Sequence, residues 1–307
     1  MTRLKCLVTG GAGFVGSHIV DSLIEKGHEV VIIDDLSTGK KENLNEKANF
    51  YEADITENIY PIFQKENPEI VIHAAAQVML RKSLEDPLKD SKINILGTIN
   101  ILEACKKSNV KKIIYTSTGG ARVGEPESLP VSEDHPLSPC SPYGISKHTA
   151  EHYVWMYHEL YDLDYLIFCF GNVYGPRDDP KCHRVTCLFA DHMLKGETPT
   201  IFGDGNQTRD FIYVKDLADF IVRSIEKNPE HKLFHLANGD QIKVNEIFEI
   251  LKEIIDFKGE AKHIEGIKGE VKDMVLDTKL VKKELGWKPV KSFEDGLRET
   301  VEWLRKF

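Results

Sequence analysis

The sequence predicts an α/β fold: a doubly wound (Rossmann) parallel sheet with a smaller, interleaved C-terminal α/β domain. Three observations support this prediction. Short apolar segments alternate with helical patterns through the first half of the chain. These segments lack the apolar–polar alternation of half-exposed strands, which is typical of parallel strands covered on both faces. A glycine-rich turn directly follows the first segment, as at the start of a strand–helix–strand unit.

The first half contains the elements of this sheet in a regular order. We expect strand Leu4–Thr9, helix Phe14–Glu25, strand Glu29–Asp34, a third strand ending at Asp54 and Ile55, strand Ile70–His73, helix Pro87–Lys107, strand Lys112–Thr116, helix Pro142–Leu160 and strand Tyr165–Phe170. Right-handed crossovers between parallel strands then place helices on both faces of the sheet.

After Gly175 the pattern becomes less regular, and glycines and prolines punctuate the loops. We expect helix Val185–Leu194, strand Thr200–Phe202, helix Val214–Lys227, strand Leu233–Leu236, and helices Val244–Ile255 and Phe293–Lys306. We therefore predict a first, dinucleotide-binding domain of residues 1–171, to which residues 213–237 return. Residues 172–307 form the predicted second, substrate-binding domain.

Composition excludes several classes of function. The 307 residues carry a formal net charge of -9 at pH 7 without any basic block, which argues against nucleic acid as a partner. No apolar run approaches about 18 residues, so we expect no membrane span and a cytoplasmic protein. The six scattered cysteines are typical of buried free thiols. Cys182 and Cys187 lack a second ligand pair at metal-site spacing, so we expect no metal.

The segment Thr9–Gly16 predicts a nucleotide-binding turn. Gly10, Gly13 and Gly16 fall between the first strand and the first helix. We expect the first glycine to allow a tight turn, the second to let the backbone approach a pyrophosphate, and the third to let helix pack on strand. The N-terminus of the helix then faces the phosphate charge.

Asp34 closes the second strand, 18 residues after Gly16, where a carboxylate accepts both ribose hydroxyls of adenosine. A 2′-phosphate there meets two like charges, from Asp34 and Asp35, without a neighbouring arginine. The predicted cofactor is therefore NAD and not NADP. The further predicted contacts to NAD are Phe14, Val15, Leu36, Ser37, Thr38, Gly39, Asp54, Ile55, Ala74, Ala75, Ala76, Asn94, Thr116, Tyr143, Lys147, Phe170 and Val173.

Tyr143 and Lys147 form the predicted catalytic pair. Residues four apart share one face of a helix, so the phenol and the ammonium point the same way. At roughly 6 Å and an effective dielectric constant of about 20, the ammonium stabilises the phenolate by ~2.8 kcal/mol and lowers the pKa of the phenol. Such a tyrosine removes the proton of an alcohol as hydride leaves its carbon. A hydroxyl from Thr118, at the end of the fifth strand, completes the relay.

The chain resembles the extended short-chain dehydrogenases/reductases of the nucleotide-sugar type, the NAD-dependent epimerase/dehydratase family. The resemblance covers nearly the whole length and rests on the segments Thr9–Gly16, Ile32–Gly39, Val71–Gln77, Ser117–Gly120, Ser141–Lys147, Asn172–Arg177, Ile201–Gly205 and Arg209–Tyr213. It implies Thr118, Tyr143 and Lys147 as the catalytic set. It also implies substrate contacts by Thr118, Gly119, Tyr143, Asn172, Val185, Thr200, Phe202, Arg209 and Lys268.

Within this family the chain is most similar to the UDP-glucose 4-epimerases. This implies an isomerase with tightly bound NAD that interconverts UDP-glucose and UDP-galactose through a transient 4-keto sugar. The related 4,6-dehydratases carry an Asp-Glu pair after the threonine, whereas this chain has Gly119 and Gly120. UDP-N-acetylglucosamine and UDP-glucuronate stay open as alternative substrates, and a dehydratase or a non-catalytic NAD-binding sensor is disfavoured.

The chain departs from its relatives at two positions, both of which we place in the substrate half. Cys169 stands where relatives usually carry arginine, and Ile267 stands where they carry a diphosphate-binding arginine. Either Lys268 or Arg177 is expected to replace the latter. The resemblance also implies a homodimer, paired through helices Pro87–Lys107 and Pro142–Leu160. The second helix carries five large apolar residues for that contact: Trp155, Met156, Tyr157, Leu160 and Tyr161.

Overall fold

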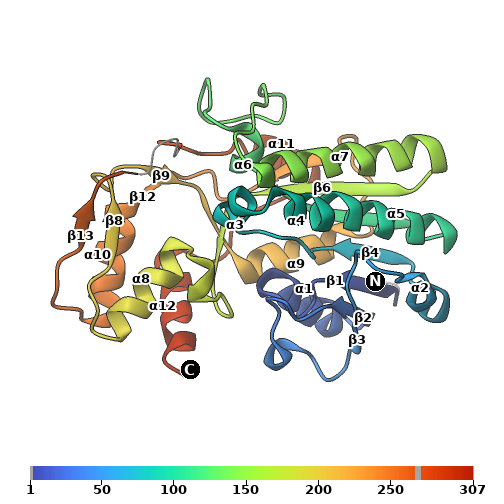
Figure 1. The fold of residues 1–307 in the computed structure, drawn as a ribbon, viewed down its shortest axis with the longest axis horizontal. Coiled ribbons are helices and arrows are strands. Elements are labelled where there is room, and N and C mark those ends of the chain that lie inside the picture. The colour runs from blue at the N-terminus through green and yellow to red at the C-terminus, as the bar shows by residue number, and fades with distance from the viewer. Residues whose placement is uncertain (1–2, 267–270, 307) are drawn as a thin grey trace. The chain divides into compact units, whose positions relative to one another are not determined.

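The computed structural model describes residues 3–266 and 271–306 (Figure 1). Two compact units form within it. Unit 1 comprises residues 1–124, 137–169 and 218–234, and unit 2 comprises residues 125–136, 170–217 and 235–307. The predicted sites at Ile267 and Lys268 lie outside the described residues.

A seven-stranded sheet forms the centre of unit 1 and confirms the predicted fold class. Its strand order is β11-β6-β5-β4-β1-β2-β3, and β1 pairs in parallel with both β2 and β4. The order reverses between β1 and β4, and ligands of doubly wound sheets bind at the carboxyl ends of strands beside such a reversal. The strands are β1 Lys5–Thr9, β2 Glu29–Asp34, β3 Asn49–Glu52, β4 Ile70–His73, β5 Lys112–Thr118, β6 Asp164–Phe170 and β11 Leu233–Leu236.

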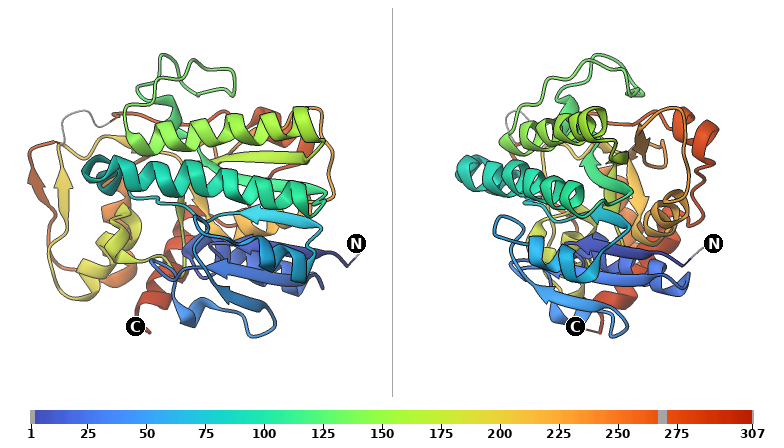
Figure 2. Two further views of the ribbon diagram at one scale, coloured as in Figure 1. Left: turned by 45° about the vertical axis from the view of Figure 1, so that its right-hand side comes forward. Right: turned by 90° about the vertical axis from the view of Figure 1, so that its right-hand side faces the viewer.

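Helices cover both faces of this sheet. On one face α5 and α7 run side by side, and α1 and α9 lie on the other (Figure 2). An ion pair of Lys26 with Asp219 joins the end of α1 to α9. The helices are α1 Phe14–Glu25, α2 Tyr60–Glu66, α3 Leu80–Glu85, α4 Pro87–Ser91, α5 Thr98–Lys107, α6 Gly120–Val123, α7 Pro142–Tyr161 and α9 Val214–Ser224, with a 3₁₀ turn η1 at Lys41–Asn43.

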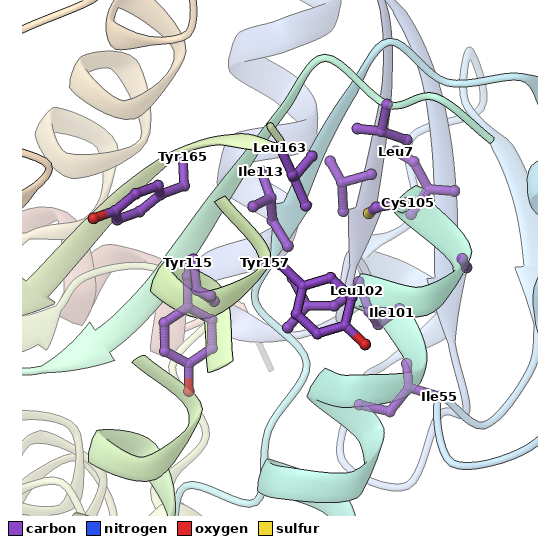
Figure 3. Close-up of a cluster of buried hydrophobic side chains, with 14 of the residues drawn as sticks. Leu7, Ile55, Ile101, Leu102, Cys105, Ile113, Tyr115, Tyr157, Leu163 and Tyr165 are labelled. Carbon is purple, nitrogen blue, oxygen red and sulfur yellow. The ribbon is translucent and has the colours of Figure 1, made fainter. Parts of the chain in front are cut away.

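The core of unit 1 lies between the sheet and helices α5 and α7. Leu7 and Ile113 from the strands meet Leu102 from α5 and Tyr157 from α7, all buried (Figure 3). Tyr157 therefore belongs to the core, although we had included it among the residues predicted to form the dimer contact. Its hydroxyl donates to Glu103 at 2.6 Å, which satisfies the polar end of the ring.

The predicted helix Pro87–Lys107 is not continuous. A π-helical turn, η2 at Lys92–Gly97, separates α4 from α5. A methyl group on Gly97 would lie 2.7 Å from the side chain of Ile55, so only glycine lets this turn pack against the segment after β3. Single π-turns interrupt helices at functional sites, and the sequence spacing alone does not reveal them.

Unit 2 has its own core, formed by helices around short strands. Phe189 of α8, Phe248 of α10 and Leu297 of α12 are buried together. The helices are α8 Val185–Leu194, α10 Val244–Ile255, α11 Lys279–Leu285 and α12 Phe293–Leu304, with a 3₁₀ turn η3 at Pro180–Cys182. The strands pair as β7 Asn172–Tyr174 with β10 Phe211–Tyr213, β8 Thr200–Phe202 with β13 Lys262–Ile264, and β9 Thr208–Arg209 with β12 Ile242–Lys243.

The boundary of unit 2 and the burial of two cysteines differ from our predictions. Residues 125–136, which we assigned to the first domain, belong to unit 2, where Val131 forms a bridge with Leu276. Cys140 is exposed and Cys182 partly exposed, whereas the other four thiols are buried as expected.

In the described part of the chain, no helix is both long and apolar enough to cross a membrane.

Candidate active site

The glycine turn after β1 leaves no space for side chains. Gly10 has φ +70°, and a methyl group there would lie 2.7 Å from the backbone nitrogen of Ala75. A methyl group on Gly16 would lie 2.0 Å from the carbonyl oxygen of Gly10, so the third glycine lets helix α1 close onto the turn itself. At Gly13 a methyl group would lie 3.1 Å from that same oxygen, which is also a tight contact.

Asp34 lies at the carboxyl end of β2 and is buried. Its Oδ2 accepts from the Ala12 backbone nitrogen at 2.9 Å, and its Oδ1 accepts from the Leu36 nitrogen at 2.8 Å. These bonds fix the carboxylate beside the glycine turn and leave lone pairs for two hydroxyl donors. A methyl group on Gly39 would lie 2.7 Å from Oδ1, so glycine keeps this carboxylate uncovered.

A buried hydrogen-bond chain that the sequence did not reveal supports the turn from below. His73 Nδ1 lies 2.7 Å from Thr9 Oγ1 and its Nε2 lies 3.0 Å from Thr98 Oγ1. Thr9 Oγ1 also accepts from the Ala75 nitrogen at 3.2 Å. Burial lowers the pKa of His73 to about 3, so the ring is neutral and donates from only one nitrogen.

Asn94 in the π-turn η2 holds three segments together. Its Oδ1 accepts from the Gln77 nitrogen at 2.8 Å. Its Nδ2 donates to the Gln77 carbonyl at 3.0 Å and to the Ser146 hydroxyl of α7 at 3.1 Å. Asn94, which we predicted as a contact to NAD, therefore joins η2 to α7 and to the loop after β4.

The remaining predicted cofactor residues of unit 1 lie at the ends of the same strands. Asp54 follows β3 and its Oδ1 accepts from the Thr56 nitrogen at 2.7 Å, with Ile55 buried beside it. Thr116 lies on β5, and its hydroxyl donates to the His73 carbonyl at 3.1 Å. Ala74, Ala75 and Ala76 follow β4 and are partly buried. The turn, the carboxylate and these small side chains together fit a dinucleotide.

Tyr143 lies in the first turn of α7, and Thr118 ends β5, on which α7 packs. Ser141 caps this helix, because its hydroxyl accepts from the Gly144 nitrogen at 3.1 Å. A methyl group on Gly144 would lie 2.1 Å from the Ala121 carbonyl oxygen, so α7 and α6 approach closely here. These contacts fix the start of the helix, and with it the direction of the phenol.

Lys147 lies one turn further and is 3% exposed. Its Nζ lies 4.1 Å from the centre of the Tyr115 ring, which attracts the charge through its π-face. Burial lowers the pKa of Lys147 to about 7, and the negative charge of Glu151 opposes this effect. The predicted pairing of this ammonium with the Tyr143 phenol is the arrangement required for proton transfer from an alcohol.

Cys169 is placed differently from our expectation. It lies in unit 1 at the buried end of β6, within the predicted first domain of residues 1–171, and not in the substrate half in which we placed its departure from the relatives. Its sulfur accepts from Arg122 Nη1 at 3.2 Å and donates to Glu151 Oε1 at 3.7 Å. This departure from the relatives therefore concerns the surroundings of the catalytic helix.

The predicted substrate residues of unit 2 are spread over its short strands. Asn172 begins β7 and is exposed, and Thr200 and Phe202 bracket β8. Arg209 lies on β9, where its Nη1 donates to the Thr208 carbonyl at 2.8 Å and to the Lys272 carbonyl at 3.2 Å. Val185 begins α8, Phe170 ends β6 and Val173 lies within β7. Gly119, in unit 1, is the buried residue before α6.

Asp210, next to Arg209, is a structural residue that the sequence did not single out. It is 2% exposed and accepts from the backbone nitrogens of Asn238 at 3.2 Å, Gly239 at 3.1 Å and Leu276 at 3.1 Å. One carboxylate thereby joins three segments of unit 2 around the strand that carries Arg209.

Comparison with known proteins gives consistent results. The model of the "NAD dependent epimerase/dehydratase family" matches residues 6–237. A provisionally named UDP-glucose 4-epimerase of Methanocaldococcus jannaschii is 47% identical over 97% of this chain and 98% of its own. The crystal structure of a Thermotoga maritima UDP-glucose 4-epimerase with UDP-glucose is similar with a TM-score of 0.96, at 42% identity over 99% of both chains.

A third similar protein is named for a different sugar nucleotide. The structure of a UDP-N-acetylglucosamine 4-epimerase from Methanobrevibacter ruminantium, in complex with UDP-N-acetylmuramic acid, matches with a TM-score of 0.93. It is 35% identical and covers 100% of this chain and 99% of its own.

We expect Gly16→Ala to abolish retention of NAD, because the new methyl group forces the turn apart. It should also lower the free energy of unfolding by about 1–3 kcal/mol, the usual cost of overpacking. NAD bound per chain after gel filtration and urea unfolding measure the two effects. Gly27→Asn is the control, since φ at Gly27 is +84° with no atom near its missing side chain, and asparagine tolerates that backbone. Wild-type NAD content in Gly16→Ala would contradict this placement of the cofactor.

Asp210→Asn should lower the free energy of unfolding by about 1–3 kcal/mol, because the amide leaves one or more buried backbone donors without an acceptor. Thermal and urea unfolding measure the change. Asp204→Asn is the matched control, because the exposed Asp204 side chain accepts from its neighbour Asn206, so its change should stay within about 0.5 kcal/mol. Equal stability of the two variants would refute the structural role of Asp210.

Proposed function

This chain belongs to the NAD dependent epimerase/dehydratase family, and from that premise we propose that it interconverts UDP-glucose and UDP-galactose at C4 of the sugar. It is an isomerase that uses NAD. The observation that carries the proposal is the buried Lys147 one helical turn after Tyr143, in the same unit as the glycine turn and Asp34.

Tyr143 acts as the base and then as the acid. When bound, NAD would supply the hydride acceptor for C4 of the sugar and the hydride donor that restores C4 from the opposite face. Tyr143 removes the proton of the C4 hydroxyl as the hydride leaves, and gives it back when the hydroxyl forms again. Lys147 stabilises the phenolate and donates to the nicotinamide ribose, while the Thr118 hydroxyl orients the sugar oxygen.

Residues of unit 2 are proposed to hold the nucleotide. Arg209 suits the diphosphate, because its backbone contacts fix the guanidinium and a guanidinium binds two phosphate oxygens at once. Asn172, Val185, Thr200 and Phe202 complete the proposed contacts, with Lys268 outside the described residues. The Methanocaldococcus jannaschii and Thermotoga maritima relatives, at 47% and 42% identity, are both named for UDP-glucose, which favours glucose over its N-acetyl form.

We also propose a homodimer formed through helices α4, η2 and α7. Leu88, Leu96, Trp155 and Leu160 are all more than half exposed on these mutually packed helices. Large apolar side chains exposed in such numbers favour a protein contact. A second copy of the chain is the proposed partner, as the family resemblance implies.

Incubation with UDP-glucose, UDP-galactose and their N-acetyl forms, followed by proton NMR, tests the activity. We expect the first pair to interconvert at least about tenfold faster, and Tyr143→Phe to lower kcat by roughly 10²–10⁴ because proton transfer is lost. Tyr161→Phe, an exposed tyrosine at the end of the same helix, should keep the wild-type rate. Turnover of the N-acetyl pair alone would assign the alternative substrate. No interconversion of any pair would reject the proposal.

Trp155→Glu should halve the mass measured by light scattering, from twice 34.9 kDa to the mass of one chain. The reason is that a carboxylate buried in an apolar contact lacks a partner and costs several kcal/mol. Val290→Glu, at an exposed valine of unit 2, is the control and should leave the mass unchanged. A wild-type chain that is monomeric at micromolar concentration would refute the dimer.

A further inference from the structure

A buried carboxylate, Glu151, lies one turn after Lys147 on α7. It is 4% exposed and makes four polar contacts. Its Oε1 accepts from the Ser117 hydroxyl at 2.5 Å and from the Cys169 thiol at 3.7 Å. Its Oε2 lies 3.3 Å from Arg122 Nη2 and 2.9 Å from His148 Nδ1. The proposed reaction assigns no role to this group.

Glu151 acts on Lys147 through charge. Residues four apart on a helix have side chains about 6 Å apart, and both of these are buried, so water screens their attraction poorly. Among the surrounding groups, Glu151 is the strongest that raises the pKa of Lys147 against the effect of burial. Without an anion nearby, a lysine this deeply buried loses its proton at neutral pH.

Arg122 competes with Lys147 for the same carboxylate. It is 4% exposed and reaches Glu151 from helix α6, with its other terminal nitrogen on the Cys169 sulfur. Burial raises the pKa of Cys169, so the thiol stays neutral and adds no second anion. One buried negative charge is therefore shared by two buried cations.

We propose that Glu151 is a positioning residue for the epimerase reaction, whose carboxylate keeps Lys147 charged beside Tyr143, and that Arg122 limits how much of this charge Lys147 receives. The proposal rests on the proposed function, because it takes Tyr143 and Lys147 as the catalytic pair. It explains why unit 1 buries an ion pair at a place where apolar side chains would pack at lower cost.

Other groups also face Lys147, and their contributions differ in sign. The Tyr115 ring and Asp90 of α4 favour its charged form, and the neutral His73 ring carries no charge at ordinary pH. The groups that face Lys147 or Glu151 from the surrounding elements are His73 of β4, Asp90 of α4, Tyr115 and Ser117 of β5, Arg122 of α6, Tyr143 and His148 of α7, and Cys169 of β6. Of these, only Arg122 has a permanent positive charge, and that charge lies against Glu151.

Glu151→Gln tests the proposal, with the titration of Lys147 followed by carbon NMR of labelled lysine and assigned with Lys147→Met. We expect the Lys147 titration to move to lower pH by about one to two pH units, the effect of one charge roughly 6 Å away at an effective dielectric constant of about 20. The value of kcat near neutral pH should fall about tenfold per pH unit, because charged lysine beside ionised tyrosine becomes rarer by that factor.

Arg122→Met separates this effect from simple damage to the core. Removal of the competing cation should move the Lys147 titration to higher pH, and the fall in kcat should be smaller in the double variant than in Glu151→Gln alone. An unmoved titration in Arg122→Met would refute the role of Arg122. If Glu151 has a purely structural role, all three variants should lose activity without any movement of the Lys147 titration. That result, or a lysine titration unmoved in Glu151→Gln, would overturn the proposal.

The matched control is Glu66→Gln. Glu66 is also a buried carboxylate of unit 1, and it accepts from the Tyr51 hydroxyl at 2.5 Å and from Lys5 at 2.9 Å. It lies on α2 and is not among the groups that act on Lys147. Its replacement should leave the Lys147 titration in place.

If Tyr143→Phe keeps full activity, the proposed function fails. If Tyr143→Phe is inactive but Glu151→Gln leaves the lysine unmoved, only the role of Glu151 fails.

Discussion

Burial of the Lys147 ammonium is the constraint on which the catalytic unit depends. An ammonium taken out of water needs compensation from fixed neighbours, or it gives up its proton. The Tyr115 ring and Glu151 supply that compensation here. The packing of α7 on β5 matters for this reason: a small rotation of the helix would move the ammonium away from the Tyr115 ring, whereas Glu151 lies on the same helix and would move with it.

The nucleotide-binding turn depends on the opposite condition, the absence of side chains. Gly10, Gly16 and Gly39 each leave a space that a methyl group would fill with a contact of 2.0 to 2.7 Å. The buried Thr9–His73–Thr98 chain then fixes the backbone below the turn without using any group that a ligand needs. Unit 1 thus combines a buried chain of hydrogen bonds with a turn that carries no side chain at Gly10 or Gly16.

The sequence was a good guide where structure is decided locally. The turn at Gly10–Gly16, helix α1 and the start of α7 follow from glycine spacing and periodicity, which act over a few residues. It failed where distant segments meet. The π-turn at Lys92–Gly97 depends on packing against Ile55, and the role of Asp210 depends on backbone donors up to 66 residues away. The contact of Arg122 with Cys169 spans 47 residues and leaves no local pattern.

The pairing of Arg122 with Cys169 also has an evolutionary consequence. The family resemblance implies an arginine on this strand in relatives, whereas here the guanidinium comes from α6 and contacts the Cys169 thiol. An arginine placed at position 169 would bring two guanidiniums against Glu151, and loss of Arg122 would leave Glu151 its contacts with Ser117, His148 and Cys169 but no buried guanidinium. The two positions are therefore expected to change together among descendants of this lineage, so that neither can be interpreted apart from the other.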